Sequence, residues 1–198
     1  MTRGDQTRQT ILDVALKEAS MLGLEGLAIG PLAKRVGMSK SGLFAHFGSK
    51  EELQVAVVEH AAELFGDWVL RPTLKDPRGE PRLQGLVERY IAWTDAPPVP
   101  GGCLLLAGAF EMDARPGPVR DAIAARVLML RQFITRAAQI AIEEGHFGAD
   151  ADPDQLAFEI HTLLFGYHVD HHFLQRKGAR ARAMTTLDSI FKAARRPS

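Results

Sequence analysis

The chain has 198 residues, of which 46% are hydrophobic and 24% charged, and this composition is typical of a globular protein that folds in water. It has neither an apolar run of membrane-spanning length nor an apolar signal core near its N-terminus, so we expect a cytoplasmic protein that does not associate with membranes. One cysteine excludes an internal disulfide framework, and the formal net charge of zero conceals +3 in residues 1–50, from seven basic and four acidic side chains.

The first predicted element is an amphipathic helix over residues 7–22. Its apolar residues recur at intervals of three and four positions, which places them on one face of a helix. Glycines at positions 23 and 26 are expected to end it. Such a helix would cover the two that follow and complete a three-helix domain. The apolar residues are Ile11, Leu12, Ala15, Leu16, Ala19 and Leu22.

Two short helices joined by a tight turn are predicted within residues 29–50. Gly30 is expected to act as the N-cap of the first helix, with Pro31 in the first turn, where its missing N–H would be unpaired in any case. Gly37 permits a sharp turn, and the hydroxyl of Ser39 is placed to cap the second helix. The two predicted helices cover about residues 31–36 and 40–47.

The second of these helices has a small and partly basic outer face. Leu43 points inwards, Ser41 lies opposite to it, and Lys40 lies at the edge of the face. A slender face of this kind suits a helix that enters the DNA major groove, where Lys40 and Ser41 would reach base edges. Spacing alone does not distinguish this interpretation from the ordinary packing of two helices.

The residues that follow favour DNA binding. Ser49 and Glu52 form a capping-box pattern that opens another helix, predicted over residues 50–69 as the link to the rest of the chain. Lys50 falls in its first turn, where a cation is unfavourable for the helix itself. A bound phosphate would reverse this effect, because helix N-termini and cations both attract anions.

Residues from about 7 to 65 resemble the N-terminal domain of the TetR (tetracycline repressor) family of bacterial transcription regulators, most specifically in the stretch LAKRVGMSKSGLFAHFGSKEEL. The resemblance implies that residues 40–42 touch bases and that His46 and Lys50 touch phosphates. Phe44 stands where the family usually has a tyrosine, so a hydroxyl that would meet a phosphate is missing, and weaker or more selective binding is expected. The implied DNA-binding residues are Ser39, Lys40, Ser41, Gly42, Phe44, His46 and Lys50.

The rest of the chain also reads as helices separated by loops rich in proline and glycine. Further helices are expected at about residues 82–94, 103–112, 118–144, 153–176 and 179–195. Glu111 is interpreted as a solvated helix end. The predicted fold is therefore all-α with about nine helices: a helix-turn-helix DNA-binding domain at 1–50, the linking helix at 50–69, and an effector-binding and dimerisation domain at 70–198.

The helix predicted at 153–176 carries two stripes of large residues. One stripe suffices for the core of a monomer, and the second indicates a partner. In the resembled family the last two helices form a four-helix bundle across a twofold axis, which implies a homodimer on a palindromic operator in double-stranded DNA. The first stripe is Leu156, Ile160, Leu163, Tyr167 and Leu174; the second is His161, Phe165, His168 and His172.

The function predicted from these features is a ligand-controlled transcription regulator, most simply a repressor released from its operator by a small, mostly apolar effector. An activator, or a regulator without a small effector, is the alternative. The resemblance places the effector among the C-terminal helices. The residues predicted to line its site are Trp93, Phe110, Met129, Phe133, Phe165 and His168.

Chemical sites are weakly indicated. His168 and His172 lie four residues apart, which can place two imidazoles on one metal ion, and a metal-dependent hydrolase using His161, His168 and His172 is a remote alternative. No cysteine or carboxylate has the spacing to complete such a site, and no nucleophile with a base or phosphate-binding loop is evident. We therefore expect no metal, no cofactor and no enzymatic activity, and we interpret Cys103 as a packing residue rather than a sensor of oxidants.

Overall fold

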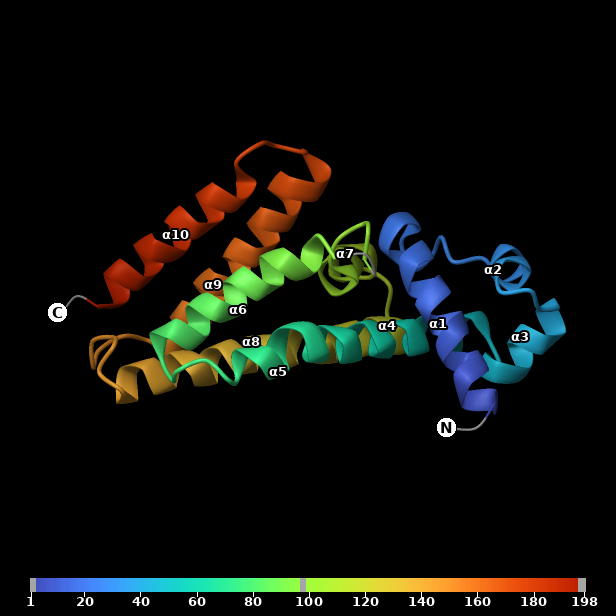
Figure 1. Cartoon of the computed structure of the whole chain (residues 1–198), viewed down its shortest axis with the longest axis horizontal. Helices are drawn as coiled ribbons and strands as arrows, with labels where there is room; N and C mark the ends of the chain where they lie inside the picture. The colour runs from blue at the N-terminus through green and yellow to red at the C-terminus, as the bar shows by residue number, and fades with distance from the viewer. Residues whose placement is uncertain (1–2, 97–98, 196–198) are drawn as a thin grey trace. The chain divides into compact units, whose positions relative to one another are not determined.

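The computed structural model describes residues 3–96 and 99–195, and every regular element within these ranges is helical (Figure 1). α4, η1 and α5 follow one another without a break, as do α9 and η2, so the described residues form nine continuous helical stretches. The predicted all-α fold is confirmed. The elements are α1 (Arg3–Leu22), α2 (Ile29–Arg35), α3 (Lys40–Phe47), α4 (Lys50–Phe65), the π-helical η1 (Gly66–Leu70), α5 (Arg71–Thr73), α6 (Glu80–Thr94), α7 (Leu104–Glu111), α8 (Pro118–Glu143), α9 (Pro153–His168), the π-helical η2 (Val169–Phe173) and α10 (Ala179–Ala194).

The chain divides into two compact units, and each is described separately. The first comprises residues 1–64 and 94–126, and the second comprises residues 65–93 and 127–198. The divisions fall at the end of α4, at the end of α6 and within α8. Within the described ranges, no helix combines the length and apolar character needed to cross a bilayer.

The first unit is built around the buried face of α1. This helix packs against α2 and α7, and α2 packs in turn against α3. The regular spacing that predicted α1 from the sequence also predicts its buried residues, since only the last of the six, Leu22, is exposed. The main buried side chains of this unit are Ile11, Leu16, Leu24, Leu27, Leu32, Leu43, Phe47, Leu53 and Val57.

The turn between α2 and α3 forms as predicted, with one correction. Gly37 has φ of +70°, and the hydroxyl of Ser39 accepts a hydrogen bond from the N–H of Gly42 at 3.0 Å. Gly30, however, is not the N-cap of α2. The cap is Ala28, whose carbonyl accepts the N–H of Leu32 at 3.1 Å, so the helix begins earlier than predicted and Gly30 lies inside it.

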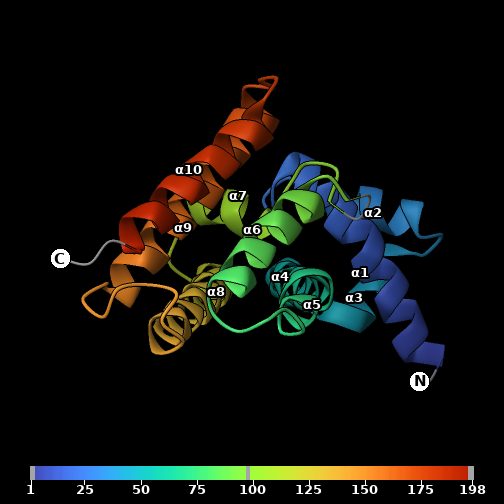
Figure 2. The same cartoon turned by 60° about the vertical axis from the view of Figure 1, so that its left-hand side comes forward.

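The second unit contains α9 and α10 as an antiparallel pair (Figure 2). α9 starts as predicted, because the carboxylate of Asp152 accepts the N–H groups of Asp154 and Gln155 and Pro153 occupies the first turn. The prediction that Leu174 joins the core stripe of α9 is wrong. The π-helical turn η2 intervenes, changes the angle per residue, and leaves Leu174 half exposed.

Candidate nucleic-acid interface

The outer face of α3 is the most distinctive surface of the first unit. Leu43 and Phe47 are buried in a helix that packs against α2, whereas Lys40, Ser41 and Ala45 are exposed. Phe44 exposes 40% of its surface. The face therefore offers one cation, one hydroxyl and one aromatic ring on a narrow helix, as the sequence predicted.

The N-terminal end of α3 is held by its own side chains. The Ser39 hydroxyl caps the helix through Gly42 N–H and also lies 3.1 Å from the hydroxyl of Ser41. A β-carbon at Gly42 would lie only 3.2 Å from Ser39 Oγ, so the compact cap requires a small residue there. Ser39 and Gly42 thus shape the end of the helix, and Lys40 and Ser41 extend from it.

Lys50, a predicted phosphate ligand, is engaged within the protein. Its ammonium group donates a hydrogen bond to the carbonyl oxygen of Glu25 at 2.8 Å and lies 3.7 Å from the Glu25 carboxylate. The predicted capping box is present, with Glu52 N–H donating to Ser49 Oγ at 3.0 Å. A phosphate that approaches the start of α4 would therefore meet a lysine whose position is already restricted.

Glu25 belongs to a second set of contacts that the sequence did not reveal. The carboxylate of Glu111, at the end of α7, accepts hydrogen bonds from the N–H groups of Leu24 and Glu25 at 2.9 and 2.8 Å. Arg115 lies 3.6 Å from the Glu25 carboxylate. The interpretation of Glu111 as a solvated helix end is wrong, because its partners lie more than 80 residues earlier in the chain.

Other basic residues near α3 are used internally. Arg35 forms an ion pair of 3.1 Å with Glu18, whose side chain is almost completely buried between the first helices. The guanidinium of Arg8 lies 4.8 Å from the centre of the Phe47 ring. His46 is partly buried, with its ring centre 6.3 Å from that of Phe47. In the described part of the chain, no acidic group lies within ion-pair distance of Lys40, which leaves its charge available at the surface.

The residues predicted to bind an effector do not all lie in one unit. Phe110 is exposed and belongs to the first unit, and the other five belong to the second. Trp93 is buried against the edges of Phe65 and Trp68, with ring centres 6.0 Å apart in each case. Met129 is exposed and Phe133 is partly buried.

His168 and Phe165 lie on the same side of α9 as His161. The ring of Phe165 meets that of His161 edge to face at 4.9 Å. Burial, together with the neighbouring His172 and His171, lowers the pKa of His168 to about 4, and burial also lowers the pKa of His161. Both imidazoles are therefore neutral at pH 7 and can act as uncharged hydrogen-bonding groups.

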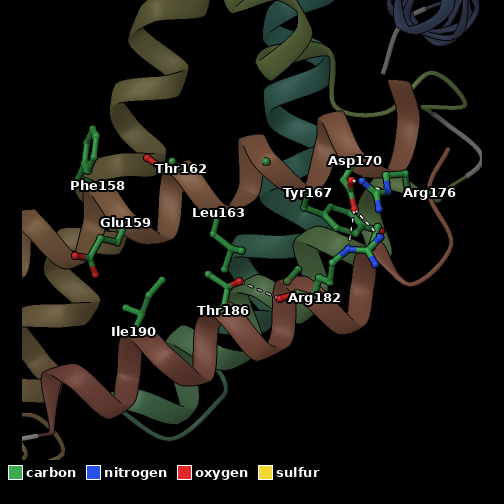
Figure 3. Close-up of a pocket in the computed structure, with 13 residues that line it drawn as sticks. Phe158, Glu159, Thr162, Leu163, Tyr167, Asp170, Arg176, Arg182, Thr186 and Ile190 are labelled. Carbon is green, nitrogen blue, oxygen red and sulfur yellow. Dashed lines mark hydrogen bonds and ion pairs between the residues drawn. The ribbon is translucent and has the colours of Figure 1, made fainter. Parts of the chain in front are cut away.

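A groove of about 590 Å³ runs between α9 and α10 (Figure 3). Its walls are mainly apolar or small side chains, and one end is closed by Asp170, which pairs with Arg182 at 2.9 Å. None of the six predicted effector residues lines it. The lining residues are Phe158, Glu159, Thr162, Leu163, Gly166, Tyr167, Asp170, Arg176, Ala179, Arg182, Ala183, Thr186 and Ile190.

Comparison with known families agrees with the geometry at both ends of the chain. Residues 11–57 match the family described as bacterial regulatory proteins, tetR family. Residues 79–187, more than half of the chain, match the tetracyclin repressor-like C-terminal domain. The chain belongs to the TetR family. The helix-turn-helix predicted from the sequence is confirmed, and the protein is a DNA-binding transcriptional regulator of this family.

Individual TetR-family proteins show how far the similarity extends. A stretch of 76 residues is 34% identical to the HTH-type transcriptional regulator AcrR of Shigella flexneri, and this match covers 38% of the chain and only 35% of that relative. A TetR transcriptional regulator from Chloroflexus aurantiacus shares the fold, with a TM-score of 0.77 and 25% identity over 98% of this chain and 94% of that one. AibR, solved with isovaleryl coenzyme A and operator DNA, has a TM-score of 0.73 at 22% identity, over 93% and 98% of the two chains.

Proposed function

We propose that this TetR-family protein is a homodimeric repressor that leaves a palindromic operator when a small, mostly apolar effector binds. The observation that carries the proposal is the outer face of α3, where Leu43 and Phe47 anchor the helix and leave Lys40, Ser41 and Phe44 exposed. An exposed cation, hydroxyl and aromatic ring together on a narrow helix are groups that the base edges and methyl groups of the major groove can contact.

In the proposed complex α3 enters the major groove. Lys40 and Ser41 contact base edges, and the ring of Phe44 offers an apolar contact for a thymine methyl group. His46 and Lys50 contact phosphates, while Ser39 and Gly42 bring the start of the helix close to the DNA. The contact to phosphate requires Lys50 to exchange its bond with the Glu25 carbonyl for a charged partner.

The proposed dimer forms through α9 and α10. The groove between them has a small residue, Gly166, near its middle, and a β-carbon there would meet no atom within 4 Å. Phe158 exposes half of its surface beside the groove. A second copy related by a twofold axis would cover these apolar positions on both protomers at once. A palindromic operator, in turn, presents successive major-groove faces about 34 Å apart to the two α3 helices of a dimer.

The proposed effector binds in the C-terminal half of the chain, near the neutral histidines of α9. His161 Nε2 and His168 Nδ1 are buried and have no hydrogen-bond partner within residues 3–96 and 99–195. Aromatic neighbours such as Phe165 supply apolar contact. AibR, which shares the fold, was solved with isovaleryl coenzyme A and operator DNA, so a protein of this fold can hold a small-molecule ligand as well as DNA. An effector changes the affinity for DNA only by its different affinities for the two shapes of the protein.

The test begins with selection of duplexes from a random library, followed by sedimentation of the protein with the selected duplex. We expect the selected duplex to be palindromic and to sediment with two copies of the chain. In the cell, the proposed protein would act in the cytoplasm, which holds the operator. Lys40→Ala and Lys50→Ala should weaken binding, and Lys75→Ala, which removes an exposed lysine of the second unit, serves as the control.

The same complex tests effector control. Compounds with an apolar body and one uncharged hydrogen-bonding group, such as alkyl phenols, are titrated while release of the duplex is followed. A protein that remains monomeric on its best duplex, or one whose affinity survives both lysine substitutions, would contradict the DNA-binding arrangement. Specific binding that no compound relieves would contradict effector control alone.

A further inference from the structure

Gly30 is a glycine that the backbone does not need. It lies in the first turn of α2, where the chain has ordinary helical geometry, and it is not among the glycines with positive φ. A glycine inside a helix costs stability relative to alanine. The space beside Gly30 shows what a larger residue would meet.

That space is occupied by the side chain of Lys40 from the neighbouring helix α3. A β-carbon at position 30 would lie 2.9 Å from Lys40 Cε and 3.4 Å from Lys40 Nζ. Real side chains do not make a contact as short as 2.9 Å between two carbons, so any residue other than glycine would displace the lysine. By contrast, a β-carbon at Gly66 would meet no atom within 4 Å.

We propose that Gly30 is a positioning residue that sets the direction of Lys40 and thereby the preference of the protein for one base pair in each half-site. The inference rests on the proposed DNA binding through α3. Lys40 is the first residue of α3, and the N-terminal residues of a recognition helix are those that contact base edges. Its ammonium group matches the O6 and N7 acceptors of guanine.

The chemistry of the contact explains why a glycine two residues into α2 controls a side chain on another helix. A long lysine side chain has many rotamers, and the exposed position of Lys40 would allow most of them. The bare backbone of Gly30 leaves room for the end of the lysine side chain, whose Cε and Nζ lie 2.9 and 3.4 Å from the position of an added β-carbon, and so it permits this direction of the ammonium group. A methyl group at position 30 closes that place, and the flexible end of the lysine swings away at little cost.

Gly30→Ala is therefore expected to lower the base preference of the protein without lowering its melting temperature. The melting temperature stays the same or rises, because alanine is the better helix former. Discrimination at the base pair read by Lys40 falls. A purely structural role for Gly30 would predict a less stable protein with its base preference unchanged, so the two explanations differ in sign.

The experiment measures the dissociation constant of the full chain for a set of duplexes in which each base pair of the selected site is substituted in turn. Wild type is expected to favour one G·C pair by about 5- to 140-fold through Lys40. Lys40→Ala should abolish that preference, and Gly30→Ala should reduce it at least about threefold. Gly66→Ala, which also replaces a helical glycine but meets no side chain, is the matched control.

The double variant decides the mechanism. If Gly30 acts through Lys40, adding Gly30→Ala to Lys40→Ala changes the base preference no further. The inference is overturned if Gly30→Ala keeps the wild-type preference, if its effect persists without Lys40, or if Lys40→Ala weakens all duplexes equally. Absence of any preferred duplex for wild type would instead overturn the proposed function itself.

Discussion

Glu111 gives the sharpest test of how the first unit is held together. Its carboxylate accepts two backbone N–H groups, those of Leu24 and Glu25, in the turn that leads from α1 to α2. Gly23 makes room for this contact, because a β-carbon there would lie 2.7 Å from Glu111 Oε1. Glu111→Ala removes both acceptors and leaves the N–H groups of Leu24 and Glu25 without this carboxylate, while the carbonyl oxygens of the two residues keep their bonds from Gln54 and Lys50.

The magnitude follows from the surroundings of the two hydrogen bonds. The bond to Leu24 N–H is partly buried and has a charged acceptor, and such bonds contribute about 1.5 kcal/mol. The bond to Glu25 N–H is exposed and contributes about 0.5 kcal/mol. We therefore expect Glu111→Ala to lower the free energy of unfolding by about 2 kcal/mol, which corresponds to a fall in Tm of roughly 4–8 °C for a chain of this size.

Thermal unfolding and amide hydrogen exchange measure the effect globally and locally. The exchange rates of the Leu24 and Glu25 amides should be higher in Glu111→Ala than in wild type. In Glu111→Gln, which keeps one carbonyl oxygen as an acceptor, these rates should be intermediate between those of Glu111→Ala and wild type. Asp113→Ala removes an exposed acidic group from the same loop and should change stability by less than about 0.5 kcal/mol. Equal stabilities of the Glu111→Ala and Asp113→Ala variants would refute the reasoning.

Three further predictions concern DNA, pH and assembly. Lys50→Met should reduce the slope of log affinity against log salt concentration by about 1.8, because each of the two lysines in a dimer contributes about 0.9. Lys75→Met should leave this slope unchanged, and titrations at several salt concentrations measure both variants. The pKa of His168 is lowered to about 4 in the folded protein, so on acidification this histidine takes up a proton in the unfolded chain before it does so in the folded one. The free energy of unfolding should therefore fall as pH drops from about 6.5 towards 4. Urea titrations measure this fall, which should be smaller in His168→Gln. Gly166→Glu should yield folded monomers in sedimentation velocity, because its β-carbon has free space within the protomer; a dimer would contradict the α9–α10 interface.

The fold was predictable because its signals are local. The bounds of α3 agree with the prediction at both ends, since Ser39 and Gly48 are residues whose capping roles depend on a few neighbours only. Asp152 and Pro153 marked the start of α9 in the same way. The errors at Gly30 and Leu174 have local causes: hydrogen bonding began α2 before Gly30, and a π-helical turn changed the register before Leu174. The error at Glu111 has a long-range cause, since its partners are Leu24 and Glu25.

The site was predictable only in part. The exposed face of α3 follows from helical periodicity, so Lys40, Ser41 and Phe44 could be found from their spacing. The contact of Lys40 with Gly30 depends on how two helices cross, which spacing does not specify. The groove between α9 and α10 likewise depends on the side chains of both helices, and Leu163 on its wall had been assigned to the core stripe.

The contacts of Lys50 connect these local and long-range features. Its ammonium group is bound by the carbonyl oxygen of Glu25, the N–H of the same residue is bound by Glu111, and the Glu25 carboxylate lies near both Lys50 and Arg115. One residue of the α1–α2 turn therefore joins the start of α4 to the end of α7. A displacement of Glu111 or Arg115 would alter the partners of Glu25 before those of Lys50, because no hydrogen bond or ion pair joins Lys50 to α7 within residues 3–96 and 99–195.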